Sequence, residues 1–332
     1  MQKNITIGDP NSEKRHHSNF FQKAWAIIKG DVIAAIHKLF LNNGRGFGRL
    51  NQALITLLPK KSDSCQVKDF RPISLVDSAP KLASKLLASR LSRRMGEIVS
   101  VNQSAFIKGR CIHDTYLLVR QVAHKVFKSK EHGLFLNLEI SRAFDSLSWP
   151  FLFEVMRAKG FVPRWLHWVA TILATSSTKI IVNGVPGRTI HHARGLRQGD
   201  PISPLLFVVA MDALSRLFVK ASGLGVISNL RGISPTQRLS LYADDVVSFL
   251  QPPVQDWNFV RAAFEIFGEA AGLRINYNKT TAVLIRGSDE DRQRVMDMLH
   301  CEMGHFPCKY LGIQLAIRKL TRADWQPLLD QT

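Results

Sequence analysis

The chain has 332 residues, of which 45% are apolar and 21% are charged, and this composition is typical of a globular protein rather than a disordered or fibrous one. Lys and Arg number 45 against 26 Asp and Glu, which gives a formal net charge of +19. The longest apolar run, Ile202 to Met211, is too short for a membrane span of about 20 residues, so we expect no integral membrane protein. Four unevenly spaced cysteines and the absence of a signal-peptide pattern favour an intracellular chain, in the nucleus or the cytoplasm.

The positive charge is concentrated in the first part of the chain. Residues 1–130 hold 23 Lys and Arg against 8 Asp and Glu, whereas residues 131–332 hold 22 against 18. A polyanion is the usual partner of so basic a segment, because each phosphate that Lys or Arg neutralises releases condensed counterions. The alternative is a basic surface that faces only solvent.

The pattern along the chain is mixed α and β, with no repeat and no low-complexity tract. Apolar residues at helical spacing predict helices, and short apolar runs predict strands. The expected elements are a helix over 20–40, a strand over 53–58, a helix over 80–95, a strand over 134–138, a helix over 148–159, a hairpin joining 178–182 to 188–192 through Asn183-Gly184, a helix over 205–220, a hairpin over 239–250 and a helix over 257–271. Residues 1–19 fit no such pattern, and we expect them to be disordered.

The helix over 80–95 carries a basic stripe. Lys81, Lys85 and Arg93 are separated by multiples of four residues, which places them on one helix face. Such a stripe suits the phosphates of a nucleic acid. A solvated helix face is an equally good interpretation of the stripe by itself.

Two adjacent carboxylates, Asp244 and Asp245, fall at the tip of the apolar hairpin over 239–250. A third, Glu139, closes the strand over 134–138, so the three meet if the two strands are neighbours in one sheet. Hard carboxylate oxygens suit Mg²⁺, and two such ions about 3.5 to 4 Å apart catalyse phosphoryl transfer. The residues alone also allow a solvent-facing turn, with Glu139 capping a helix.

The surroundings of these carboxylates resemble one protein family. Tyr242-Ala243-Asp244-Asp245 stands between apolar arms, and further stretches arrive in the family's order and at compatible spacings over residues 20–328. These stretches are LITLLPKK, DFRPISL, NQSAFIKGRCIHD, AFDSLSW, NGVPGRTIHHARGLRQGDPISPLLF, AGLRINYNKT and FPCKYLGIQL. Together they closely resemble the reverse transcriptase domain of plant non-LTR (LINE-type) retrotransposons.

The resemblance implies an α+β fold of the right-hand polymerase type, whose palm has an antiparallel sheet that carries the YADD hairpin. It implies an RNA-directed DNA polymerase that copies an RNA template from a DNA primer with dNTPs, using Mg²⁺ or Mn²⁺. The expected domains are fingers over 20–130, a palm over 131–300 that can interleave with the fingers, a primer-grip hairpin over 301–320 and the start of a truncated thumb over 321–332.

The resemblance also assigns catalytic roles to matching positions. Asp244 and Asp245 match the metal-binding pair of the family's YxDD turn, and Glu139 falls at the position of the first metal ligand. Lys279 resembles the lysine proposed to protonate the departing pyrophosphate, a reasonable general acid when it is held near phosphates.

Further positions match residues that bind the nucleotide and the primer. Lys60 and Arg71 match residues on the triphosphate, which Arg binds bidentately and Lys as a mobile point charge. Phe144 matches the aromatic residue that excludes ribonucleotides by crowding a 2′-hydroxyl, and Gln198 resembles a residue that lines the nucleotide pocket. The turn that grips the primer end resembles the stretch from Tyr310 to Gly312.

Glu139 departs from the family, which has Asp at this position. Its extra methylene moves the carboxylate by roughly 1 Å, and Mg²⁺ tolerates little error in its bond lengths, so a misplacement of that order costs about 100-fold in rate. Residues 1–19 also differ from the family's lead-in, and the chain stops where a thumb would begin. We therefore expect a partial or degenerate copy with weak or no activity. The competing interpretation is a noncatalytic, basic nucleic-acid-binding remnant.

Overall fold

The computed structural model describes residues 10–41, 44–59, 63–66, 69–251 and 254–318. The chain forms two compact units, one from Met1–Leu86 with Pro163–His192 and the other from Leu87–Val162 with Ala193–Thr332. The units divide the chain at other points than the expected domains, because residues 87–130 group with the second unit and residues 163–192 with the first. Lys60 and the expected thumb segment over 321–332 lie outside the described residues.

The first unit contains a five-stranded sheet and its helices. Its elements are α1 (Pro10–Leu41), a short 3₁₀ turn η1 (Phe47–Arg49), β1 (Gln52–Pro59), β2 (Phe70–Val76), the first part of α2 (Ser78–Ser92), α7 (Pro163–Ala174), β4 (Ser177–Val182), β5 (Val185–Pro186) and β6 (Ile190–His191). The strand expected over 53–58 is confirmed as β1, which pairs with β2 in antiparallel and with β4 in parallel orientation.

α1 begins earlier than expected. It starts at Pro10, ten residues before the predicted start at residue 20. Proline favours the first turn of a helix, because its fixed φ suits that turn and the missing N–H would have no partner there. The expectation of disorder over residues 1–19 is therefore corrected for residues 10–19.

The hairpin expected around Asn183-Gly184 is present, but its second arm is divided. Asn183 and Gly184 have φ angles of 51° and 81°, as a two-residue turn with two left-handed positions requires. β4 then pairs first with β5 and afterwards with β6, so the single strand expected over 188–192 does not form. The pairing with β5 ends at Pro186, and the Gly187 N–H donates one more hydrogen bond to the Ile180 carbonyl at 2.9 Å.

The second unit is built on a sheet with the strand order β10-β9-β3-β8-β7. Its strands are β3 (Gly133–Glu139), β7 (Leu239–Tyr242), β8 (Asp245–Leu250), β9 (Thr281–Ile285) and β10 (Glu302–Met303), with a separate hairpin of β11 (Cys308–Tyr310) and β12 (Ile313–Leu315). Its helices are α3 (Met95–Ile98), α4 (Ile112–Lys128), α5 (Ala143–Ser146), α6 (Trp149–Ala158), α8 (Ser203–Gly223), η3 (Pro235–Gln237), α9 (Val254–Ala271), η4 (Tyr277–Lys279) and α10 (Asp289–Leu299).

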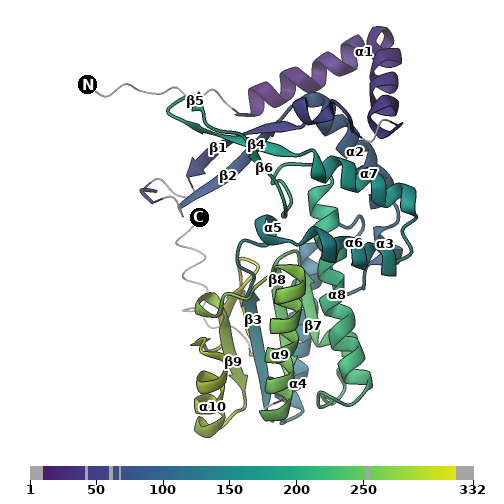
Figure 1. Ribbon diagram of the computed structural model, residues 1–332. Coiled ribbons are helices and arrows are strands. Elements are labelled where there is room, and N and C mark those ends of the chain that lie inside the picture. The colour runs from purple at the N-terminus through teal and green to yellow at the C-terminus, as the bar shows by residue number, and fades with distance from the viewer. Residues whose placement is uncertain (1–9, 42–43, 60–62, 67–68, 252–253, 319–332) are drawn as a thin grey trace. The chain divides into compact units, whose positions relative to one another are not determined.

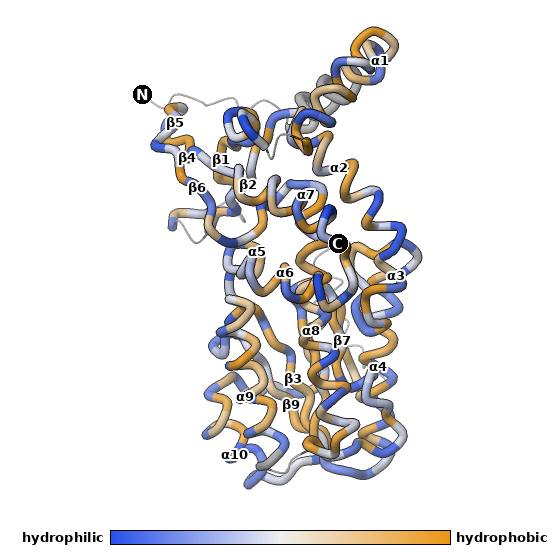
Figure 2. Tube along the Cα trace, turned by 45° about the vertical axis from the view of Figure 1, so that its right-hand side comes forward, coloured by the Kyte–Doolittle hydropathy of each residue, from blue (hydrophilic) through white to orange (hydrophobic). Residues whose placement is uncertain are grey.

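Both faces of this sheet are covered. On one face, Val119 and Val122 of α4 pack with Phe135 of β3 and Phe249 of β8 in one buried cluster, and the two phenylalanine rings lie 5.6 Å apart. Figure 1 shows α9 across the other face. The strands β3 and β9 are accordingly apolar along most of their length, whereas α10 is largely hydrophilic (Figure 2). Such a doubly covered sheet reads as continuous apolar runs in sequence.

The predicted helices of the second unit are confirmed with small shifts of their ends. The helix over 148–159 is α6, and Ser148 caps it by accepting a hydrogen bond from the Phe151 N–H at 3.4 Å. The helices over 205–220 and 257–271 are α8 and α9. The helix over 80–95 ends at Ser92 and is followed by the separate short helix α3. Among the described residues, no helix combines the length and apolar character that a membrane span needs.

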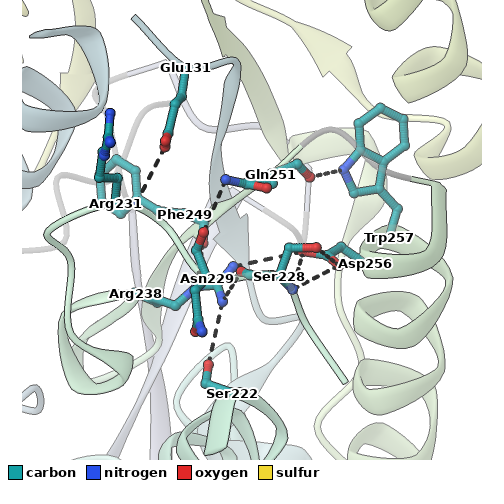
Figure 3. A network of polar contacts seen from close by, with 10 residues as sticks. All are labelled: Glu131, Ser222, Ser228, Asn229, Arg231, Arg238, Phe249, Gln251, Asp256 and Trp257. Atoms are coloured by element: carbon teal, nitrogen blue, oxygen red, sulfur yellow. Dashed lines mark hydrogen bonds and ion pairs between the residues drawn. The ribbon is translucent and has the colours of Figure 1, made fainter. Parts of the chain in front are cut away.

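A buried polar network ties α9 to the sheet and to the loop after α8 (Figure 3). Arg238 and Asp256 are 1% and 2% exposed, and their charged groups lie 3.9 Å apart. Asp256 accepts hydrogen bonds from the Ser228 N–H at 2.9 Å and from its hydroxyl at 3.0 Å. Arg238 donates to the backbone oxygens of Ser228 at 2.6 Å and Phe249 at 3.3 Å. Burial lowers the pKa of Arg238, and the charge of Asp256 opposes this shift.

Replacement of Asp256 by Asn should destabilise the protein strongly. The substitution leaves the buried Arg238 guanidinium without a counter-charge, and breaking a buried pair in this way costs about 3 to 5 kcal/mol. The free energy of unfolding, measured by urea titration of both proteins, gives the difference.

Glu265→Gln is the matched control, because it makes the same chemical change on the same helix. Glu265 pairs with Arg261 at 3.5 Å, but both side chains are about half exposed, so the expected loss is below about 0.5 kcal/mol. Equal losses in the two variants would show that the buried pair is not important for stability.

Candidate active site

Strand pairing brings the three predicted carboxylates to one end of the sheet of the second unit. β3 pairs with β8 in antiparallel register, and Glu139 lies directly opposite Asp245. β7 and β8 form the expected hairpin, in which Tyr242 pairs with Asp245 and the turn consists of Ala243 and Asp244. Opposed residues on neighbouring antiparallel strands have their Cβ atoms about 4.5 to 5.5 Å apart. The expectation that the two strands are neighbours is confirmed.

The aspartates of the turn hold their protons unusually tightly. Partial removal from water raises the pKa of Asp244, and the charge of Glu139 adds to the effect. The same removal from water, followed by the charges of Asp244 and Glu139, raises the pKa of Asp245 to about 6. Three acids therefore share a space in which each additional negative charge is unfavourable.

Glu139 is also bound to a cation of the chain. The Lys279 ammonium group donates a hydrogen bond to the Glu139 carboxylate at 2.6 Å. The segment that carries Lys279 is held in place by the backbone, because the Asn276 N–H donates to the Glu139 carbonyl at 2.8 Å and Ile275 forms a bridge with Ile140. The structure thus brings together Lys279 and Glu139, which lie 140 residues apart in the sequence.

The three acidic residues suit a divalent cation, because they supply carboxylate oxygens and the strand register places them at one end of the sheet. Asp244, Asp245 and Glu139 provide hard oxygen ligands, and their mutual repulsion would be relieved by a bound positive charge. In the described part of the chain, however, no three His, Cys, Asp or Glu side chains are grouped closely enough to hold a metal ion. The Glu139 carboxylate is paired with Lys279 instead.

Phe144 lies on α5, which starts four residues after Glu139. Its ring stacks on Phe207 of α8, with ring centroids 4.8 Å apart and an angle of 20° between the planes. The Phe144 carbonyl accepts a hydrogen bond from the Leu196 N–H at 2.6 Å. This bond holds the loop that carries Gln198 against α5. The Gln198 side chain is half-buried.

Gly195 makes this close approach possible. It has a φ of 79°, and a Cβ atom at this position would lie 2.4 Å from the Asp145 carbonyl oxygen. No other residue fits there without displacing the backbone. The side chain of Trp149 secures the same loop by donating to the Gly195 carbonyl at 2.7 Å.

The β11–β12 hairpin forms within the segment expected to grip the primer. Leu311 and Gly312 form its turn, with φ angles of 48° and 83°. Tyr310 is only 1% exposed and belongs to the core cluster with Phe135 and Phe249. The Tyr310 ring therefore belongs to the core, and a contact of the Tyr310 backbone with a primer stays a prediction. Gly312 is exposed, and its contact with a primer stays a prediction.

The remaining predicted binding residues lie on β2, on α2 and directly after α2. Arg71 is exposed on β2, opposite Leu58 of β1. Lys81 on α2 is half-buried, Lys85 on the same helix is exposed, and Arg93 follows directly after its end. Contacts of these side chains with a triphosphate or with phosphates stay predictions.

One residue in contact with the turn was given no role in the sequence analysis. Gln103 is fully buried, and its side-chain oxygen accepts a hydrogen bond from the Ala243 N–H at 3.2 Å. The only sequence signal was its place in the matching stretch NQSAFIKGRCIHD. Nothing in spacing or hydropathy indicates a contact over 140 residues.

The sheet is antiparallel except for the parallel pair β9–β10, and with its carboxylate-bearing hairpin it has the fold of a right-hand polymerase palm. The family model for "Reverse transcriptase (RNA-dependent DNA polymerase)" matches residues 58–315. The chain therefore belongs to the reverse transcriptase family, and it is a reverse transcriptase domain of the non-LTR retrotransposon type.

Several curated proteins are similar to this chain. The "Transposon TX1 uncharacterized 149 kDa protein" of Xenopus laevis is 29% identical over 80% of this chain and 20% of its own length. The Pol polyprotein from the retrotransposable element R2DM of Drosophila melanogaster is 26% identical over 90% of this chain and 28% of its own length. An uncharacterized mitochondrial protein of Arabidopsis thaliana is 35% identical over 26% of this chain and 75% of its own length. The chain thus spans between a fifth and three tenths of the two large relatives.

Solved structures support the fold. Telomerase of Candida tropicalis in complex with a TWJ fragment of telomeric RNA has a TM-score of 0.54 and 10% identity over 85% of this chain and 47% of its own. The apo telomerase of the same species has a TM-score of 0.50 and 10% identity over 70% of this chain and 44% of its own. The expected α+β fold of fingers and palm is confirmed.

Replacement of Phe144 by Ala should relax discrimination against ribonucleotides if the ring lies against the sugar. Loss of the ring opens space for a 2′-hydroxyl, and a purely steric pocket rejects a hydroxyl by about 100-fold at most. We expect the ratio of kcat/KM for dNTP over rNTP to fall by about 10- to 100-fold.

Phe151→Ala serves as the control, because Phe151 forms an aromatic pair with Phe267 at 5.6 Å in the same unit. This variant should keep the ratio of the unmodified protein. Unchanged ribonucleotide rejection by Phe144→Ala would remove Phe144 from this role.

Proposed function

We propose that this chain acts as an RNA-directed DNA polymerase, which extends a DNA primer with dNTPs along an RNA template. The observation that carries the proposal is the position of Glu139 opposite Asp245, with Asp244 in the adjoining turn. Carboxylates brought together at one end of a sheet supply oxygen ligands of the kind that two-metal nucleotidyl transfer uses. Membership of the reverse transcriptase family supports the same activity.

Asp244, Asp245 and Glu139 would hold the divalent cations, for which we propose Mg²⁺ with Mn²⁺ as a substitute. Bound there, a divalent ion supplies positive charge that stabilises the phosphates during transfer. The other residues position the substrate and hold a proton. Phe144, fixed by its stack on Phe207, limits the space beside the sugar, and Lys279 holds a proton on Nζ next to Glu139.

A second candidate is a noncatalytic domain that binds nucleic acid. One specific observation favours it, namely that the Glu139 carboxylate is engaged by Lys279 while no three-ligand group is formed among the described residues. The large excess of Lys and Arg over Asp and Glu would suffice for binding without catalysis.

Single-nucleotide incorporation on an RNA template with a DNA primer and Mg²⁺ separates the two candidates. Glu139→Asp should raise the incorporation rate by about 10- to 100-fold, because the shorter carboxylate matches the strict geometry of Mg²⁺. Asp244→Asn should abolish incorporation, which also excludes a contaminating polymerase.

Glu154→Asp is the matched control for the same chemical change, since Glu154 lies on the exposed side of α6 and pairs with Arg157. Its rate should equal that of the unmodified chain. Nucleic-acid binding without incorporation by any variant would favour the noncatalytic candidate. If Asp244→Asn is inactive but Glu139→Asp does not change the rate, Glu139 does not limit the enzyme.

Binding of RNA–DNA duplex should depend on salt through the basic stripe. Neutralising Lys81, Lys85 and Arg93 to Gln should reduce the slope of log K against log salt concentration by about 0.7 to 0.9 for each lost phosphate contact. Fluorescence anisotropy at several salt concentrations measures the slope.

The control removes three exposed arginines elsewhere, namely Arg261, Arg292 and Arg294 of α9 and α10. It changes the net charge equally and should leave the slope close to that of the unmodified protein. Equal slopes in both triple variants would show that the stripe on α2 is only a solvated face.

We also propose a plant host for the element. The similarity to the Arabidopsis mitochondrial protein supports this origin. Hybridisation of the coding sequence to plant nuclear and mitochondrial DNA tests it, and a signal confined to other kingdoms would refute it.

A further inference from the structure

The segment 102–104 lies along the outer edge of β7. The Leu241 N–H donates to the Asn102 carbonyl at 2.8 Å, and the Ser104 N–H donates to the Leu241 carbonyl at 3.2 Å. The Asn102 side-chain amide donates to the Leu239 carbonyl at 2.8 Å. β7 is the last strand of its sheet, so this segment covers an edge whose backbone groups would otherwise lack partners.

Gln103 extends this contact to the carboxylate-bearing turn. Its side chain is fully buried, and its oxygen Oε1 accepts hydrogen bonds from the Ala243 N–H at 3.2 Å and from the Ala105 N–H at 2.9 Å. Ala243 immediately precedes Asp244 and Asp245. The contact thus fixes the backbone from which both aspartates project.

Ala243 needs such support. Its φ of 54° is in the left-handed region, which costs a residue with a Cβ about 1 to 2 kcal/mol, and such a conformation persists only where the surroundings impose it. Ala243 is 6% exposed, so water has little access to its N–H. The buried oxygen of Gln103 is the hydrogen-bond acceptor that this N–H finds.

Gln103 is itself fixed from two sides. Arg110 donates hydrogen bonds to the carbonyl oxygens of Gln103 and Ser100. The neighbouring Asn102 side chain accepts a hydrogen bond from the Ser215 hydroxyl of α8 at 2.8 Å. The backbone of Gln103 is therefore held in place by contacts that do not involve the turn of Ala243 and Asp244.

We propose that Gln103 is a positioning residue, which holds Ala243 in its left-handed conformation and thereby sets the positions of Asp244 and Asp245. It acts through the backbone of the turn. The catalytic consequence rests on the proposed polymerase function, whereas the structural role does not. A loss of this contact displaces the carboxylates, and displacements of about 1 Å at a reacting centre cost about 100-fold in rate.

Hydrogen–deuterium exchange of the Ala243 amide, in the full chain, tests the structural role directly. Gln103→Met keeps the length of the side chain and removes the acceptor, so exchange at Ala243 should be about tenfold faster. Ser176→Ala is the matched control, because it removes a buried hydrogen bond, from the Ser176 hydroxyl to the Leu173 carbonyl at 2.6 Å, in the other unit. Equal exchange at Ala243 in these two variants overturns the proposal.

Primer extension provides the second measurement. Gln103→Met should lower kcat by about 10- to 100-fold, with KM for dNTP and Kd for primer–template changed less than twofold. Ser176→Ala, which removes a buried hydrogen bond in the other unit, should keep the full kcat. A loss shared equally between kcat and primer–template binding would indicate a general structural defect and contradict the proposal.

If the unmodified chain incorporates no dNTP, the proposed polymerase function fails, and exchange at Ala243 still decides the role of Gln103. If Gln103→Met does not fold, Gln103→Asn replaces it, since the amide is kept but is one methylene too short to reach Ala243. A folded Gln103→Asn with unchanged exchange at Ala243 refutes the proposal.

Discussion

The pairing of β3 with β8 is the constraint on which the candidate active site depends. Its register runs from Leu134 opposite Leu250 to Glu139 opposite Asp245. A slip of one residue would turn every side chain of β8 to the other face. It would disrupt the packing on both covered faces and move Asp245 out of its position opposite Glu139. The register is held by the hydrophobic core, in which Phe135 and Phe249 are both 1% exposed. The chemistry at one end of the strands is thus positioned by apolar packing along their length.

The ion pair between Glu139 and Lys279 connects the end of β3 to the segment before β9. Lys279 supplies one positive charge to a group of three acids, and both partners of the pair are substantially exposed, at 61% and 44% for the two side chains. An exposed pair of this kind contributes little to stability. The pKa values of Asp244 and Asp245 are raised first by their burial and then by neighbouring negative charges. Lys279 therefore compensates the negative charge of Glu139 but not the charges of Asp244 and Asp245.

Local patterns predicted most of the elements, because apolar spacing depends on the few residues of one helix or strand. The motif around Asp244 predicted the hairpin, and the strand end at Glu139 predicted its partner. Contacts between distant segments were not accessible in this way. The bond from Lys279 to Glu139 spans 140 residues, and the bond from Ala243 to Gln103 does the same. The packing of the Tyr310 ring in the core was likewise not accessible from its motif, because it depends on contacts with distant strands.

The discontinuous first unit affects the order in which the nascent protein can fold. β1 ends at Pro59, but its parallel partner β4 begins only at Ser177. At a synthesis rate of about 5 to 20 residues per second, the ribosome needs roughly 6 to 24 s to make the intervening chain. During this interval the edge of β1 that later binds β4 is open, and open edges invite pairing with other chains. β3, from Gly133 to Glu139, is synthesised within the same interval. The first sheet is therefore still incomplete, and open to pairing with other strands, when the first strand of the second unit is made.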